Sequence, residues 1–312
     1  MRESAEPVDM MSEPARGHLA MLLFSALVAG SFALGAQVAN LVSPVAFTAV
    51  RFVLATALVG IAIMVRGRVT GSSLAAPWRY LVLGGIFALY FVLMFEGLKT
   101  ASPVSTSAVF TLTPALSALF GWFLLRQRTT PRIALALALG AAGALWVIFR
   151  ADPMAIVKLN IGHGEKIFFL GSIAHAFYTP LVRRLNRGES ALVFSFWTMV
   201  AGSALLWAYG WAEIAATAWR EMPAVVWVTL GYTAFFASAV TFVLLQYATL
   251  RLPASKVMAY TYLTPSWVVV WQLFLGQPVP SLLVCSGIGL TVTALLLLLK
   301  DGDAMPARTP AK

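Results

Sequence analysis

The sequence has few charged residues for its length. Only 11% of its 312 residues are charged, against roughly 25% in an average soluble domain, and 60% are hydrophobic. This balance excludes an ordinary soluble enzyme, a nucleic-acid-binding domain and a disordered chain. The net charge of +10 therefore indicates basic loops beside a membrane, and we expect no nucleic-acid partner.

Residue patterns for catalysis and for cofactors are also missing. Cys285 is the single cysteine, which excludes an intrachain disulfide and a CxxC metal site. The histidines are His18, His163 and His175, and none belongs to an HExxH motif. GxSxG and GxxxxGK[ST] motifs are absent as well. We therefore expect no enzyme activity, no cofactor, no metal and no use of ATP.

Ten apolar runs follow one another along the chain. Each is close to the ~20 residues that a helix needs to span a bilayer, whereas strands of a membrane barrel are about half as long. The runs are 18–38, 44–65, 79–98, 103–125, 131–149, 166–186, 190–211, 224–249, 254–275 and 280–299. They predict an all-α polytopic membrane protein with ten transmembrane helices and both termini on one side.

The distribution of basic residues predicts the orientation. Of the 22 lysines and arginines, sixteen lie in segments on the side of the termini, five lie on the other side, and Arg51 lies within a run. Basic loops stay in the cytoplasm, so we predict cytoplasmic tails at 1–17 and 301–312. The first of these carries four acidic residues against two arginines, which is unlike the leader of a signal peptide.

An internal repeat is indicated by the tripeptide Leu-Thr-Pro, which occurs at 112–114 and again at 263–265. We predict two five-helix halves, 18–149 and 162–300, joined by an outer linker at 150–161. Five is an odd number, so the two halves insert with opposite orientation. Inverted repeats are typical of secondary transporters, which bind their cargo near the midplane between the halves.

Several segments resemble the EamA type of the drug/metabolite transporter superfamily, over about residues 18–300. The resemblance rests on Pro44 to Phe52, Ser105 to Ala108 and Pro114 in the first half, and on Ala174 to Tyr178, Leu181 to Arg184 and Ala254 to Pro265 in the second. Within the superfamily the chain is most similar to the YddG-type exporters of aromatic and other neutral amino acids. The resemblance implies a multi-pass protein of the bacterial inner (plasma) membrane that works in the export direction.

Polar and aromatic side chains inside the apolar runs are the candidates for a binding site, because such groups usually face the protein interior or a water-filled cavity. The candidate substrate-binding residues are Ser31, Tyr90, Thr111, His175, Tyr178, Trp197, Tyr260 and Trp267. Hydroxyls, amides and aromatic walls suit a zwitterion. We expect no lysine or arginine near the midplane, which favours neutral or zwitterionic cargo over phosphorylated cargo.

Some of these candidates have a second interpretation. Aromatic residues are common in belts at the headgroup level, although Tyr90, Tyr178 and Trp267 are expected to lie too deep for a belt. His175 is either a hydrogen-bonded core residue or a proton carrier, and Thr111 either bonds its own helix or faces the cavity. Since no deep carboxylate is expected, we predict downhill transport.

Arg51 and Glu96 are expected to form a structural ion pair in the outer layer of the membrane. An arginine inside a helix is costly unless it pairs or reaches the headgroups. Two alternatives to the pair remain open: Arg51 snorkels to the outer surface, or it contacts the substrate.

Together these patterns predict a monomeric secondary transporter in a lipid bilayer. It would export small neutral or zwitterionic metabolites, chiefly aromatic and other neutral amino acids, by alternating access through a central cavity. The alternative is export of a different small metabolite or drug. A channel is disfavoured because the sequence shows neither a ring of charge nor a filter loop.

Overall fold

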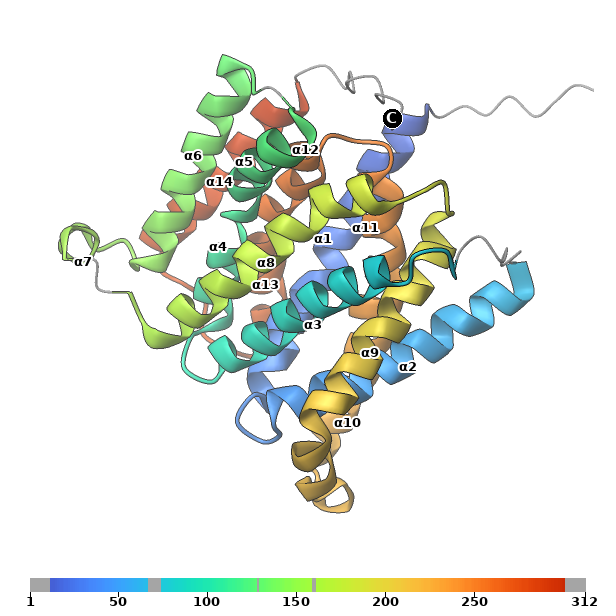
Figure 1. The fold of residues 1–312 in the computed structure, drawn as a ribbon. Helices are drawn as coiled ribbons and strands as arrows, with labels where there is room; N and C mark the ends of the chain where they lie inside the picture. The colour runs from blue at the N-terminus through green and yellow to red at the C-terminus, as the bar shows by residue number, and fades with distance from the viewer. Residues whose placement is uncertain (1–11, 67–73, 128, 159–160, 301–312) are drawn as a thin grey trace, which may run out of the picture.

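The structure is a computed structural model that describes residues 12–66, 74–127, 129–158 and 161–300. In these ranges the chain is helical and contains no strand. Figure 1 shows the long helices packed side by side in one bundle, with the start of α1 and the end of α14 toward the same end. Because the helices are apolar and long, the chain is a multi-pass membrane protein.

Eight helical segments of the described ranges are long and apolar enough to cross a membrane. They are α1 (Glu13–Val38), α2 (Pro44–Arg66), α3 (Trp78–Leu98), α4 (Pro103–Phe110) with α5 (Thr113–Leu125), α6 (Pro131–Ile148), α9 (Ala191–Ala216), α10 (Ala224–Ala234) with η3 (Phe235–Val240) and α11 (Thr241–Thr249), and α14 (Leu282–Leu299).

Two further helical segments pack in the same bundle. They are α8 (His163–Leu185), which packs against α3 and α5, and the broken segment α12 (Ala254–Ala259), η4 (Tyr260–Leu263) and α13 (Thr264–Phe274), which packs against α1, α4 and α5. α8 carries charged residues in its first and last turns, and neither α8 nor the segment broken at η4 is among the eight. Ten crossings therefore stay a prediction.

The ends of several segments differ from the predicted ones. α1 begins at Glu13, where the Ser12 side chain caps it, so the helix includes part of the predicted tail 1–17. Residues 1–11 and the predicted tail 301–312 lie outside the described residues. The predicted linker 150–161 contains a short helix, α7 (Pro153–Val157), which projects from the bundle. A single turn η2 (Trp219–Glu221) precedes α10.

Both Leu-Thr-Pro tripeptides lie where a long helix is interrupted. α4 ends at Phe110 and α5 begins at Thr113, while η4 ends at Leu263 and α13 begins at Thr264. Proline lacks an amide hydrogen, so it suits the first turn of the new helix after each break. The hydroxyls of Thr113 and Thr261 are 3.1 Å apart and join the two breaks.

Glycines allow the closest helix crossings. A Cβ on Gly84 of α3 would lie 2.5 Å from the backbone nitrogen of Gly202 of α9, and a Cβ on Gly143 of α6 would lie 2.6 Å from the carbonyl oxygen of Gly287 of α14. A Cβ at Gly289, two residues further along α14, would meet nothing within 4 Å. Gly287 therefore lies on the packed face of α14, and Gly289 does not.

Candidate functional site

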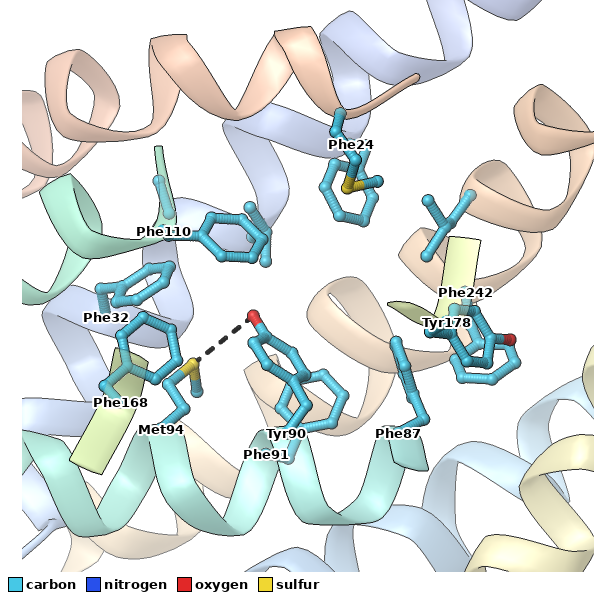
Figure 2. Packing of buried hydrophobic residues seen from close by; sticks show 14 of the residues in the cluster. Phe24, Phe32, Phe87, Tyr90, Phe91, Met94, Phe110, Phe168, Tyr178 and Phe242 are labelled. Atoms are coloured by element: carbon cyan, nitrogen blue, oxygen red, sulfur yellow. Dashed lines mark hydrogen bonds between the residues drawn. The ribbon is translucent and has the colours of Figure 1, made fainter. Parts of the chain in front are cut away.

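The centre of the bundle is filled by a cluster of aromatic rings, called here the central aromatic cluster. Its members come from α1, α3, α4, α8 and α11: Phe24, Phe32, Phe87, Tyr90, Phe91, Phe110, Phe168, His175, Tyr178 and Phe242. Figure 2 shows Phe110, Phe32 and Phe168 on one side of Tyr90, and Phe87, Tyr178 and Phe242 on the other. Three of the predicted site residues, Tyr90, His175 and Tyr178, therefore meet at one place.

His175 lies among these rings, and one of its ring nitrogens has no hydrogen-bond partner among the described residues. Its ring centroid is 4.4 Å from that of Tyr90, 5.1 Å from Phe110 and 5.7 Å from Phe87. The side chain is 1% exposed, and its Nδ1 has no hydrogen-bond partner among the described residues. A buried polar atom without a partner is costly. The Nδ1 is thus available to a ligand or a water molecule that enters the cluster.

Tyr178 is held by Gln246, a buried residue in the second half of α11. The side-chain nitrogen of Gln246 on α11 donates a hydrogen bond of 2.7 Å to the Tyr178 hydroxyl. The phenol keeps its own hydrogen for another acceptor. The amide oxygen of Gln246 has no partner in the described chain. This pair therefore offers both a donor and an acceptor beside the aromatic rings.

The remaining candidates on α1, α13 and the α4–α5 break have different contacts. Ser31 is buried, and no described residue bonds its hydroxyl. Thr111 donates to the carbonyl oxygen of Ala108 at 2.6 Å, so its hydroxyl is bonded within its own helix. The indole nitrogen of Trp267 donates to the Ser25 hydroxyl at 3.3 Å and links α13 to α1.

Two predicted site residues make their aromatic contacts away from the cluster. Trp197 on α9 packs against Phe196 and Tyr80, with ring centroids 5.1 Å and 6.5 Å away. The Tyr260 hydroxyl is 3.1 Å from Nδ1 of His18, near the start of α1. Both candidates rest on depth along a helix, and depth alone does not say which face of the helix points to the centre.

Arg51 and Glu96 do not form the expected ion pair; both are described residues with other partners. Arg51 is buried and donates from Nε to the Ser238 hydroxyl at 2.6 Å and from Nη2 to the Ala237 carbonyl oxygen at 2.7 Å. Glu96 pairs with Lys99 at 2.7 Å on the partly exposed end of α3. Arg51 points into the bundle, so it does not snorkel to the outer surface either.

A buried ion pair that sequence reasoning missed joins α3 to the α8–α9 connection. Nη2 of Arg79 is 2.7 Å from a carboxylate oxygen of Glu189, and the two side chains are 1% and 7% exposed. Burial alone would raise the pKa of Glu189, but hydrogen bonds from Arg79 and from the backbone N–H of Arg187 outweigh it and lower that pKa. The sequence offers no signal for this pair beyond a basic residue at a helix start.

The architecture and the apolar helices define a multi-pass membrane protein, and its centre holds polar groups among aromatic rings. Comparison with known families agrees with a transport protein. The chain belongs to the EamA-like transporter family, whose model matches residues 15–149 and, a second time, residues 163–300.

Individual relatives extend over most of the chain. A protein of Bacillus subtilis (strain 168), described as the uncharacterized transporter YyaM, is 28% identical over 265 residues, which are 84% of this chain and 87% of that protein. A solved crystal structure matches with a TM-score of 0.70 at 22% identity and covers 92% of this chain and 96% of that one. The similarity to the solved structure shows a shared fold.

Proposed function

We propose that this EamA-family member is a secondary transporter for small neutral or zwitterionic metabolites, with aromatic and other neutral amino acids as its main cargo. The observation that carries the proposal is the central aromatic cluster with its unpartnered polar atoms. His175 Nδ1 and the Gln246 amide oxygen are buried without a hydrogen-bond partner in the described chain. Each such atom costs about 1–3 kcal/mol unless a ligand or water satisfies it.

The chemistry of the cluster suits an aromatic amino acid. Rings from five helices offer edges and faces to an aromatic side chain. The Gln246 amide oxygen can accept a hydrogen bond from an ammonium group. No carboxylate of the described residues belongs to the cluster. The buried Glu165 lies in the first turn of α8 and accepts a hydrogen bond from Ser105. Downhill transport without proton coupling is therefore part of the proposal.

Alternating access between two inverted halves is the proposed mechanism. Support comes from the family model, which matches the chain twice, and from the Leu-Thr-Pro breaks, whose threonines Thr113 and Thr261 meet. α8 and the broken segment α12–η4–α13 would complete ten crossings, with both termini in the cytoplasm. We further propose a monomer in the bacterial inner membrane, with export as its direction.

Purified protein in liposomes tests the substrate range. We expect saturable counterflow of labelled phenylalanine and of other neutral amino acids, because the cluster offers aromatic walls and uncharged polar groups. Aspartate and lysine should exchange at least about tenfold more slowly, since an extra buried charge without a partner costs several kcal/mol. Equal rates for charged and neutral amino acids would contradict the proposal.

Export of another small apolar metabolite or drug is the second candidate function. It is favoured by the composition of the cluster, which is almost wholly aromatic and would accept a ring without an amino-acid backbone. Labelled compounds of this kind can replace phenylalanine in the counterflow assay. Saturable exchange of an aromatic amine or an aromatic alcohol, with no exchange of any amino acid, would favour this candidate.

A further inference from the structure

Arg51 is a buried cation whose hydrogen-bonding groups are only partly used. Its side chain is 0% exposed and its guanidinium lies over the ring of Phe91, 3.9 Å from the centroid. Nε and Nη2 each donate one hydrogen bond, whereas Nη1 has no partner among the described residues. The two bonded acceptors, Ser238 and Ala237, are neutral. A buried arginine usually has a carboxylate or phosphate as its partner.

Both acceptors belong to η3, a π-helical segment (Phe235–Val240) between α10 and α11. Such segments are rare, and they occur often at functional sites. Here η3 presents a carbonyl oxygen and a hydroxyl to Arg51. These two bonds fix one edge of the guanidinium and leave Nη1 and the second hydrogen of Nη2 on the other edge. That edge has the geometry that binds a carboxylate through two parallel hydrogen bonds.

Arg51 lies next to the central aromatic cluster, at the level of the middle turns of a neighbouring helical segment. Ala237, its acceptor, is near the middle of the stretch from Ala224 to Thr249. Phe91, which stacks on the guanidinium, is 4.7 Å by ring centroid from Tyr90. Tyr90 in turn is 4.4 Å from His175. A continuous path of side chains therefore connects the arginine to the candidate site.

We infer that Arg51 is the carboxylate anchor of the substrate site, so that the transported molecules carry a carboxylate next to an apolar or aromatic group. This inference rests on the proposed function and narrows it, because an amine or a neutral alcohol would lack the anchored group. It also corrects the expectation that no arginine lies near the midplane. The cargo carboxylate supplies the negative charge that the described residues do not give to Arg51.

Matched ligands test the anchor independently of transport. The purified protein in detergent is mixed with 3-phenylpropionate, which has the ring and the carboxylate, or with 2-phenylethylamine, which has the ring and an amine; sodium chloride serves as the anion control. We expect 3-phenylpropionate to raise the melting temperature in a saturable manner, and the other two to have no such effect. Equal protection by acid and amine, or none by either, would overturn the inference.

Variants then assign the effect to Arg51. Arg51→Lys keeps the charge but loses the fork of donors, and we expect the apparent Kd for 3-phenylpropionate to rise about tenfold or more. Ser238→Ala removes one fixed acceptor and should weaken binding of the acid several-fold, which keeps the test available if Arg51→Lys does not fold. Lys99→Met removes an exposed cation and should change nothing. Unchanged affinity in a folded Arg51→Lys or in Ser238→Ala overturns the inference.

Phenylalanine counterflow distinguishes a failure of the proposed transport function from a failure of the Arg51 anchor. No exchange of any amino acid by the wild type would contradict the proposed function, whereas binding of the acid through Arg51 would still stand. Exchange of phenylalanine with the same KM in wild type and in Arg51→Lys would contradict the anchor and leave the transport function intact.

Discussion

Replacing Arg79 with methionine is expected to lower the free energy of unfolding by about 3–5 kcal/mol, because the change leaves the buried carboxylate of Glu189 without its cation. Arg79 also donates to the carbonyl oxygens of Ala75, Ala76 and Leu185. One side chain thus joins the start of α3 to the end of α8 and to the connection before α9. The measurement is the melting temperature of the purified protein in detergent.

Lys99→Met is the matched control for this experiment. The Lys99–Glu96 pair has the same N···O distance of 2.7 Å, but its side chains are 31% and 39% exposed. An exposed pair contributes only about 0–1 kcal/mol. If Arg79→Met lowered the melting temperature as little as Lys99→Met, the buried pair would not stabilise the bundle.

The pH dependence of stability follows from the lowered pKa of Glu189. A carboxyl group whose pKa is lower in the folded state stabilises the fold above its unfolded pKa, and this contribution disappears as the pH falls through the folded value. The difference in melting temperature between wild type and Arg79→Met should therefore have its largest value at neutral pH. It should narrow as the pH falls below the ordinary value of 4.5.

Gly84→Leu is expected to destabilise the protein by about 3 kcal/mol or to prevent folding, because overpacking of a close contact forces backbone shifts. A Cβ at this position would lie 2.5 Å from the backbone nitrogen of Gly202 and 2.6 Å from the carbonyl oxygen of Thr198. Both obstacles are backbone atoms of α9, and they cannot rotate away as a side chain could. Melting temperature and yield of folded protein measure the effect.

Gly231→Leu gives the control for Gly84→Leu. Gly231 lies on α10 at an exposed position, and nothing lies within 4 Å of a Cβ placed there. We expect a change of no more than about 0.5 kcal/mol, since the new side chain would project away from the bundle. If Gly84→Leu and Gly231→Leu lowered stability equally, the close α3–α9 crossing would not be the cause of the destabilisation.

The helices can be predicted well from the sequence because the hydrophobic runs are long and their boundaries carry prolines. Pro103 and Pro131 begin α4 and α6 as expected. The π-helical segment η3 cannot be predicted, since Phe235 to Val240 is an ordinary apolar stretch whose geometry depends on its neighbours. The packed face of α14 escapes prediction as well, because small residues occur on more than one of its faces.

The candidate site can be predicted only in part, for a related reason. Position along a helix gives the depth of a side chain, and three residues chosen by depth, Tyr90, His175 and Tyr178, lie together in the central aromatic cluster. It does not give the direction of the side chain around the helix axis. Depth therefore suggests the outer layer and Glu96 for Arg51, although its guanidinium turns inward to η3.

The most direct test of the central claim is phenylalanine counterflow by His175→Phe in liposomes. Phenylalanine keeps a ring among the neighbours of His175, and no described residue loses a hydrogen bond to Nδ1, so the melting temperature should stay close to that of the wild type. If the central aromatic cluster binds the cargo, exchange should fall about tenfold or more, because one polar contact to the substrate is lost. Trp197→Phe, outside the cluster, should keep the wild-type rate. A folded His175→Phe variant that exchanges phenylalanine as fast as the wild type would contradict the account.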